Sequence, residues 1–317
     1  MRADPQETLT PDQARAVLAL AVSDTGPQPA LSEQTLLVLR RVLDHGSATE
    51  GVRHLLGYDE RAPEVLVAYA QLVGDEEGGS AELLVHPEHR RRGHGTALVE
   101  SLLEAAPRVR VWAHGDGEAA RGLAGRLGLV TVRDLWQMSR PLSGDGSELP
   151  EARLPEGFAA RTFEVGADEE RWLAVNATAF ASHPEQGRVD RRDLDARIAE
   201  TWFDASGFIL VDDRRDTHVE GAAALPLAAF HWTKVVPGED SGEVYVVGVD
   251  PAYQGLGLGR AVTVLGLEHL RDRGLSEATL YVDGDNEAAV ATYGKLGFHR
   301  TTVDVMYARP VHPAVGA

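Results

Sequence analysis

The chain has 317 residues, of which 43% are hydrophobic and 25% charged, an ordinary composition for a globular protein. Its 31 basic and 49 acidic residues give a net charge of −18, which disfavours binding to nucleic acid or anionic membrane surfaces. The sequence has no cysteine, which excludes disulfides, thiolate zinc sites and cysteine nucleophiles.

The length suits two domains of about 150 residues, each able to bury its own core. No apolar run approaches the roughly 20 residues that a membrane span needs. Residues 1–5 are polar and acidic and lack the apolar stretch of a secretory signal. We therefore expect a cytoplasmic protein with no nucleic-acid or membrane partner.

In the first half, an aliphatic strand is predicted at residues 82–85, followed by a turn rich in glycine at 93–95. A helical pattern follows over residues 96–104. The segment 142–155 is small and polar and contains Pro150 and Pro155, which is typical of a linker.

In the second half, helices are predicted near residues 168–181 and 190–203. Strands are predicted near 208–213, 221–230 and 243–249, and a helix over 260–273. The pattern of both halves is helices, a hairpin, a strand, a glycine turn, a helix, a strand, a helix and two closing strands. This order predicts an α+β fold with a mixed, mostly antiparallel sheet flanked by helices.

The two halves are copies of one another. Residues 86–95 match 250–259, and the later block 111–120 matches 280–289, so two ordered blocks repeat with nearly constant spacing. We therefore predict domains at 1–141 and 156–317, joined by a linker at 142–155. Two fused copies can imitate a dimer within one chain, which favours a monomer.

The glycine turn of each copy suits an anion. It presents unpaired backbone N–H groups at the positive end of a helix, where a pyrophosphate binds well. A Walker loop is excluded because Gly-Lys-Ser/Thr is absent, and the spacing of Gly255, Gly257 and Gly259 misses the dinucleotide fingerprint. Both turns share a basic or amide residue, Arg90 or Gln254, three residues before a glycine.

These motifs resemble the GNAT superfamily of N-acetyltransferases. The resemblance rests on a strand, Gln254-x-x-Gly257-x-Gly259, a helix and a further strand, and then on Asn286, Tyr293 and the segment 296–298. It covers nearly the whole chain twice. The tandem layout and length are similar to those of the mycothiol synthase family of actinobacteria, whose members acetylate the cysteinyl amine of a cysteine–glucosamine–inositol conjugate. One departure is Gly255-Leu256, where that family often has basic residues.

The resemblance implies acetyl-CoA as co-substrate and direct attack without an acyl-enzyme, and we expect no metal. The implied coenzyme residues of the second copy are Val247, Gly248, Val249, Gln254, Gly255, Leu256, Gly257, Leu258, Gly259, Arg260, Asn286, Glu287, Ala288, Ala289, Val290 and Ala291. In the first copy they are Leu83, Leu84, Val85, Arg91, Arg92, Gly93, His94, Gly95 and Thr96. Asn286 could equally serve as a helix N-cap, and both roles are compatible.

Two residues of the second copy are predicted to be catalytic. Glu243, which we place at the start of a strand, is the predicted general base, acting through a water, and Tyr293 is the predicted acid for the departing thiolate. The alternatives are a solvated glutamate and a core aromatic. In the first copy these positions are Gly79 and Ala124, and Asn286 aligns with Gly117, so the first copy is predicted to be degenerate.

The acceptor is expected to be a small, hydroxyl-rich amine similar to desacetylmycothiol, met by carboxylates and a few polar donors. The resemblance nominates Glu33, Glu185, Lys234, Glu243 and Tyr281. A polyamine, an aminoglycoside or a protein N-terminus is an alternative acceptor, and a non-catalytic acyl-CoA-binding regulator is the alternative to an enzyme. The histidines show no metal-binding spacing.

Overall fold

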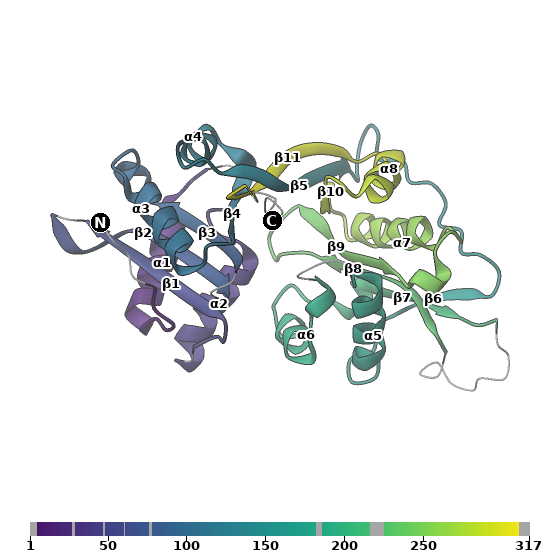
Figure 1. The fold of residues 1–317 in the computed structure, drawn as a ribbon. Coiled ribbons are helices and arrows are strands. Elements are labelled where there is room, and N and C mark those ends of the chain that lie inside the picture. Colours follow the sequence, from purple (N-terminus) through teal and green to yellow (C-terminus); the bar gives the residue numbers. More distant parts are fainter. Residues whose placement is uncertain are drawn as a thin grey trace, which may run out of the picture. The chain divides into compact units, whose positions relative to one another are not determined.

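The chain's structure, a computed structural model, describes residues 5–26, 29–46, 48–59, 61–75, 78–181, 186–215 and 225–310. Its contacts divide the chain into two compact units. Unit 1 comprises residues 1–135 and 302–317, and unit 2 comprises residues 136–301. Each unit is a sheet flanked by helices (Figure 1).

Unit 1 holds the first copy and the end of the chain. Its elements are α1 (Pro11–Ser23), α2 (Glu33–His45), β1 (Val52–Asp59), β2 (Ala62–Gly74), β3 (Gly79–Val85), α3 (His94–Ala105), β4 (Val109–Ala113), α4 (Glu118–Arg126) and part of β11 (His299–Ala308). The strand order is β1-β2-β3-β4-β11. Strands β3 and β4 are parallel and the other pairs are antiparallel, so the sheet is mixed.

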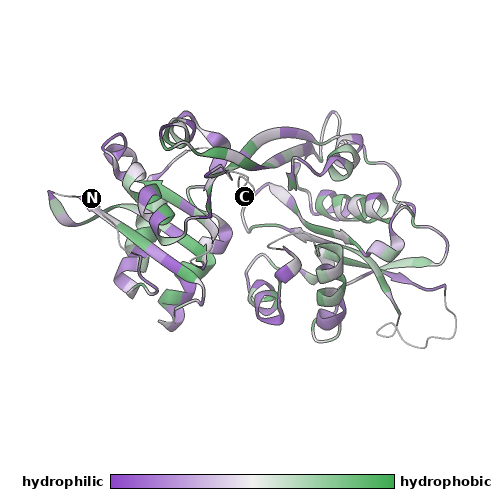
Figure 2. Cartoon of the chain, in the orientation of Figure 1, coloured by the Kyte–Doolittle hydropathy of each residue, from purple (hydrophilic) through white to green (hydrophobic). Residues whose placement is uncertain are grey.

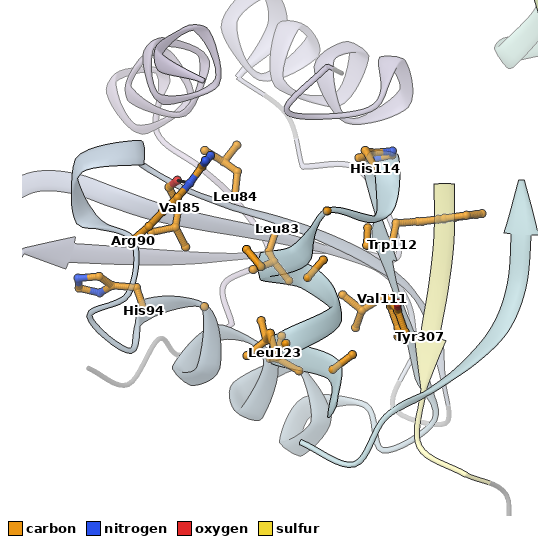
Figure 3. Close-up of a pocket in the computed structure, with 18 of the residues that line it drawn as sticks. Leu83, Leu84, Val85, Arg90, His94, Val111, Trp112, His114, Leu123 and Tyr307 are labelled. Atoms are coloured by element: carbon orange, nitrogen blue, oxygen red, sulfur yellow. Dashed lines mark hydrogen bonds between the residues drawn. The ribbon is translucent and has the colours of Figure 1, made fainter. Parts of the chain in front are cut away.

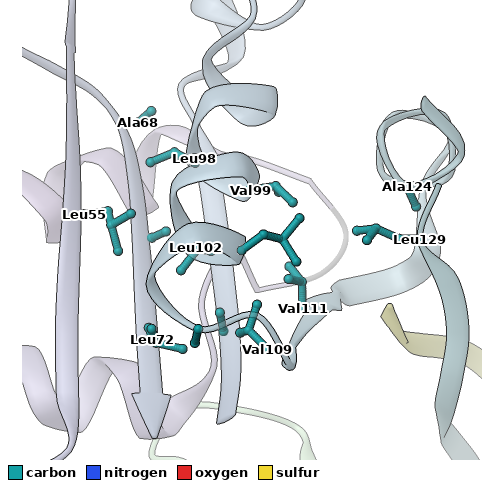
Figure 4. Packing of buried hydrophobic residues seen from close by; sticks show 14 residues of the cluster. Leu55, Ala68, Leu72, Leu98, Val99, Leu102, Val109, Val111, Ala124 and Leu129 are labelled. Carbon is teal, nitrogen blue, oxygen red and sulfur yellow. The ribbon is translucent and has the colours of Figure 1, made fainter. Parts of the chain in front are cut away.

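The two faces of this sheet are covered by different helices. Leu98 and Leu102 of α3 pack on Leu55 and Leu72 of the strands, as Figure 4 shows. On the other face, α1 and α2 pack against Tyr69, which is fully buried. Alternation along β2 explains this arrangement, because successive side chains point to opposite faces.

Unit 2 repeats the plan. Its elements are part of β5 (Val130–Pro141), β6 (Phe158–Thr162), α5 (Glu169–Ala179), α6 (Arg191–Ile198), β7 (Phe208–Asp213), β8 (Leu227–Lys234), β9 (Ser241–Val249), α7 (Leu258–Asp272), β10 (Glu277–Asp283), α8 (Glu287–Lys295) and the start of β11. The strand order is β5-β10-β9-β8-β7-β6, with β9 and β10 parallel.

Helices α7 and α8 cover one face of this sheet, and α5 and α6 cover the other (Figure 1). The α5/α6 face is aromatic, with Trp172 and Trp232 fully buried. Helix α6 buries only Leu194 among its residues, and Figure 2 colours it mostly as hydrophilic. The α+β class with a mixed sheet in each copy is thus confirmed.

Some elements differ from the sequence prediction. Strand β7 has the predicted bounds, but β6 was not predicted, because it has only five residues and Phe158 is its one large apolar side chain. In the described chain a single long strand, β5 or β11, follows the last helix of each copy, where the pattern predicted two. Of the strand predicted at 221–230, residues 221–224 lie outside the described part.

The closing strands cross between the units. Strand β5 belongs to the first copy, but its end from residue 136 is part of unit 2, and β11 of the second copy joins unit 1 from residue 302. Tyr307 of β11 pairs with Val111 of β4. Contacts therefore divide the chain differently from the repeats, for which 1–141, 142–155 and 156–317 remain our proposed boundaries.

A buried network of charges stabilises the α5/α6 side of unit 2. Arg161 contacts Asp168 and Asp212, with Nε 2.7 Å from Asp212 Oδ2, and Arg171 contacts the same two carboxylates at 3.1 and 2.9 Å. Asp212 is fully buried. Each arginine thus forms an ion pair with both aspartates, and each aspartate with both arginines.

We expect Asp212→Ala to lower the free energy of unfolding by about 3–5 kcal/mol, because it leaves two largely buried guanidinium groups without this partner. A urea titration followed by tryptophan fluorescence measures it. The matched control is Asp272→Ala, which removes an exposed partner of Arg271 and should cost less than about 1 kcal/mol. Equal effects of the two variants would contradict the prediction.

Candidate active site and coenzyme sites

Strand β9 of unit 2 has an open edge. Its parallel pairing with β10 runs from Ser241–Glu277 to Val244–Leu280, although both strands continue, to Val249 and Asp283. On the other side of β9, the N–H of Asp250 donates to Ala228 O at 3.0 Å. Because backbone groups alternate along a strand, the N–H groups of Val247 and Val249 point to the open edge.

A glycine turn follows this edge. Gly255 and Gly257 have φ values of 80° and 81°, the left-handed region that favours glycine. Gly257 is the N-cap of α7, so the first N–H groups of that helix have no capping side chain. Gly259 lies beside β9, where an added Cβ would be in van der Waals contact with the strand, 3.4 Å from Val249 Cγ2. Amide donors of strand and helix therefore converge, as an anionic, strand-like ligand requires.

Unit 1 repeats this geometry. The β3–β4 pairing ends at Ala81–Val111, so the rest of β3 has an open edge. The N–H of His86 donates to Val67 O of β2 at 2.8 Å, and by alternation the N–H of the preceding residue, Val85, points to the open edge. Gly93, with φ 92°, caps α3 as Gly257 caps α7. Arg91 takes the place of Gly255 and keeps a positive φ of 64°, an uncommon conformation for a residue with a side chain.

A cavity of about 970 Å³ lies at the open edge of unit 1 (Figure 3). It extends from the glycine turn, with Arg91 and His94, to the end of β4 at Trp112. All the coenzyme residues predicted for the first copy line it except Arg92. Figure 3 shows Leu83, Val85 and Val111 directed into it. Its size and lining suit a long ligand with one anionic end.

Other lining residues were missed from the sequence. Trp112 and His114 belong to the block that matches 281–283, so the repeat could have indicated them. Asp24 and Tyr307 come from segments far apart in sequence and gave no signal. Arg90 Nε donates to Val85 O at 3.1 Å and its Nη2 lies 2.5 Å from Asp24 Oδ2, so Arg90 fixes the cavity wall.

A buried ion triad also contributes to this cavity. His114 lies between Glu82, 3.0 Å from Nε2, and Asp304, 3.1 Å from Nδ1. Burial alone would lower the pKa of His114, but hydrogen bonds and charges from Asp304 and Glu82 outweigh it and raise that pKa to about 10. Ser32 and Thr35 also donate to Glu82, which ties the start of α2 to the triad.

The triad predicts a pH dependence of stability. The pKa of His114 is higher in the folded state than the 6.5 of an unfolded chain, so its contribution is complete below pH 6.5 and is lost as pH rises through about 10. We expect wild-type stability to fall between pH 7 and 10 relative to His114→Gln, and the variant to be about 3–5 kcal/mol less stable at pH 7. Parallel curves in urea titrations across this range would contradict the assignment.

The predicted base and two of the predicted acceptor contacts of unit 2 share one face, whereas the predicted acid, Tyr293, packs with α8 on the other face. Glu243 of β9 lies directly opposite Lys234 of β8 and Thr279 of β10. Directly opposed residues point to the same side of a sheet, and Tyr281 is two positions beyond Thr279. Glu243, Lys234 and Tyr281 therefore lie on the α5/α6 face, and Tyr281 is 40% exposed.

Helix α8 carries the predicted acid. Asn286 is its N-cap and accepts from Ala289 N at 3.1 Å, the structural role foreseen for it. Tyr293 is half-buried beside Phe298, and burial raises its pKa to about 12, so the phenol stays protonated at neutral pH. The fully buried Arg140 donates to Leu296 O at the end of α8.

The remaining predicted residues are placed as follows. Glu33 is the first residue of α2 in unit 1, directly after the N-cap Ser32. Glu185 lies outside the described residues. In unit 1, Gly79 starts β3, Gly117 is the N-cap of α4, and Ala124 is buried, so none of these positions carries an acid, a base or an amide.

Within the described ranges, no group of three or more histidines, cysteines or acidic residues could hold a metal ion. The helices of that part are too short or too polar to cross a membrane.

The chain resembles known acetyltransferases throughout its length. The acetyltransferase (GNAT) family model matches twice, at residues 23–129 and 172–298. A mycothiol acetyltransferase of Kytococcus sedentarius is 49% identical over 310 residues, which cover 96% of this chain and 97% of that protein. One of Streptomyces coelicolor is 52% identical over 304 residues, covering 94% and 92%.

Solved structures agree on the fold. A GNAT N-acetyltransferase from Sphaerobacter thermophilus has a TM-score of 0.64 at 23% identity and covers 100% of this chain and 98% of its own. A tandem GNAT protein of the clavulanic acid biosynthesis pathway has a TM-score of 0.66 at 16% identity, covering 96% and 98%. At these identities the structures support the fold alone, whereas the sequence relatives establish that the chain belongs to the mycothiol acetyltransferase family, an acetyltransferase family with two GNAT domains.

Proposed function

We propose that this enzyme transfers the acetyl group of acetyl-CoA to the cysteinyl amine of desacetylmycothiol, the cysteine–glucosamine–inositol conjugate, in the last step of mycothiol biosynthesis. The observation that carries the proposal is the open edge of β9. There the amides of Val247 and Val249 lead to the start of α7, whose first N–H groups have no capping side chain. The names of the relatives supply the acceptor.

Coenzyme binding in unit 2 follows from this edge. The amides of Val247 and Val249 pair with the pantetheine arm as an added strand would, and the amides after Gly257 hold the pyrophosphate. Arg260, exposed on the first turn of α7, adds a positive charge. Asn286 and residues 287–291 line the other side of the arm. No metal takes part in this proposal.

In the reaction, Glu243 accepts a proton from the attacking amine, through a water. The N–H of Val249 donates to the thioester oxygen as negative charge develops on it, and such a donor is worth about 10²–10³ in rate. Tyr293, whose phenol is protonated at neutral pH, donates its proton to the departing thiolate. The amine must arrive neutral, so the rate should rise with pH until it is deprotonated.

Unit 1 is proposed to bind a coenzyme without turnover. Its open strand edge and its glycine turn repeat those of unit 2, and a cavity lies beside them, but unit 1 has no counterpart of Glu243 or Tyr293. Glu82, the acidic residue of β3, is already ionically paired with His114 and hydrogen-bonded by Ser32 and Thr35, which leaves it little capacity as a base.

For the acceptor, we propose Lys234, Glu243 and Tyr281 as contacts from the α5/α6 face of unit 2. Glu33 and Glu185 are proposed on the family resemblance. The acceptor is a small molecule; the net charge of −18 argues against nucleic acid and anionic membranes as partners. We propose that the enzyme is a cytoplasmic monomer.

The test is release of free CoA thiol from acetyl-CoA with a panel of amines. Turnover with desacetylmycothiol, and none with kanamycin or spermidine, supports the proposal. Turnover that prefers kanamycin or spermidine would replace the acceptor. Tight acetyl-CoA binding with no turnover on any amine would instead indicate a non-catalytic acyl-CoA-binding regulator.

A further inference from the structure

Two aromatic rings hold the ammonium group of Lys234. Its Nζ lies 5.1 Å from the centre of the Trp202 ring and 5.3 Å from that of Tyr245. The two rings are 5.1 Å apart and inclined by 64°, so they form two walls of a corner around the cation. Both distances are within the range of about 6 Å over which a ring face attracts a cation.

A β-bulge lies at Tyr245, beside this corner. Trp232 of β8 pairs with Val246 of β9, but the next residue, Thr233, pairs with Val244, so Tyr245 is the extra residue. Without the bulge, Tyr245 and Val246 would point to opposite faces. Instead both pack on the α5/α6 face, while Val247 packs with α7 on the other side. Tyr245 thus shares the face of Glu243 by alternation, and the bulge adds Val246 to that face and turns Val247 to the other.

Tyr245 is itself fixed on two sides. Arg197 of α6 donates from Nε to the Tyr245 hydroxyl at 2.9 Å, and its Nη1 donates to Asp193 O at 2.9 Å within the helix. The ring meets the fully buried Trp232 edge-on, with centres 5.4 Å apart. Trp202 is also buried. Both rings of the corner are therefore held in place by their own neighbours.

We propose that Trp202 and Tyr245 are positioning residues, an aromatic clamp that fixes the Lys234 ammonium beside Glu243 and so sets affinity for the oxygen-rich part of the acceptor. The inference rests on the proposed function, in which Lys234 contacts the acceptor. A free lysine loses side-chain entropy when it binds, and a clamp removes part of that cost before the acceptor arrives. The ammonium of Lys234 then donates to hydroxyl oxygens of the acceptor at a fixed place.

The test separates the acceptor from the coenzyme. Tyr245→Leu removes the ring and should raise the KM for desacetylmycothiol about tenfold, with kcat and the KM for acetyl-CoA within about threefold of wild type. The ratio of kcat/KM between this acceptor and cysteine methyl ester, which lacks the hydroxyl-rich part, should fall by a similar factor. Tyr245→Phe keeps the ring, loses the Arg197 hydrogen bond, and should restore most of the affinity.

A double-mutant cycle tests whether the clamp acts through Lys234. In a Lys234→Met background, Tyr245→Leu should have little further effect on the acceptor KM. The inference would be overturned if Tyr245→Leu raised the acceptor KM equally in both backgrounds, or if it raised the KM for acetyl-CoA as much as that for the acceptor. In either case, turnover of desacetylmycothiol by the wild type would still support the proposed function. Absence of wild-type turnover with desacetylmycothiol would overturn the proposed function and this inference with it.

Discussion

Gly259→Trp is expected to abolish acetyl transfer, whereas Gly95→Trp should leave it within about threefold of wild type. The two glycines hold equivalent places at the start of α7 and α3. A Cβ at either would sit 3.4 Å from its nearest neighbour, Val249 Cγ2 or Leu123 Cδ2. Neither has a left-handed φ, so an indole is accommodated by the backbone but fills the space beside the strand edge.

The expected loss in Gly259→Trp exceeds about 10³-fold, because the coenzyme cannot place its thioester where Val249 donates. The variants serve as controls for one another, since each adds the same bulk to the same kind of helix start. Calorimetry should give two acetyl-CoA sites for the wild type and one for each variant. Full activity of Gly259→Trp, with loss in Gly95→Trp, would place the chemistry in unit 1.

Local patterns predicted much of this fold because they depend on few neighbouring residues. The aliphatic run 208–213 forms β7 with the predicted bounds, and the glycine turns open α3 and α7 as expected. Helix α6 ends at Ile198, five residues before the predicted end. Trp202 and Phe203 are apolar, but they serve the aromatic cluster rather than the helix, and helical periodicity cannot distinguish these uses.

The exchange of closing strands could not be predicted. The ends of β5 and β11 follow equivalent helices in two copies of one sequence, so local pattern does not say which copy's sheet each one joins. Only the tertiary pairs, such as Tyr307 with Val111, distinguish the alternatives. The same holds for Asp304, which meets His114 across 190 residues of chain.

The candidate site was predictable where it repeats and obscure where it depends on backbone irregularity. The coenzyme contacts around Gly95 could be predicted because that turn matches the turn around Gly259 in the other copy. The bulge at Tyr245 was not, because the run 244–247 reads as an ordinary aliphatic strand whichever residue is extra. Reading it without the bulge would put Val246 and Val247 on the wrong faces and so mislead about which amides reach the open edge.

Glu243→Gln should lower kcat by about 10²–10⁴, the usual contribution of a positioned base, with the KM for acetyl-CoA nearly unchanged. Glutamine keeps the size and one hydrogen-bond acceptor but cannot accept a proton at neutral pH. Without Glu243, the proton released as the amine attacks must pass to hydroxide or another base of the solvent, so the activity of the variant should keep climbing towards high pH, where that of the wild type has levelled off. Pre-steady-state thiol release between pH 6 and 10 measures this.

Tyr293→Phe provides the comparison within the same unit. It removes the proton that we assign to the departing thiolate but leaves the ring against Phe298, so the fold of α8 should persist. Because a CoA thiolate is a good leaving group, the loss in kcat should be about 10–10²-fold, smaller than that of Glu243→Gln. This loss in kcat should be seen at high pH. If Glu243→Gln kept the wild-type rate and pH profile while Tyr293→Phe lost activity, Glu243 would be an acceptor contact only, and the base would have to be sought elsewhere on the α5/α6 face.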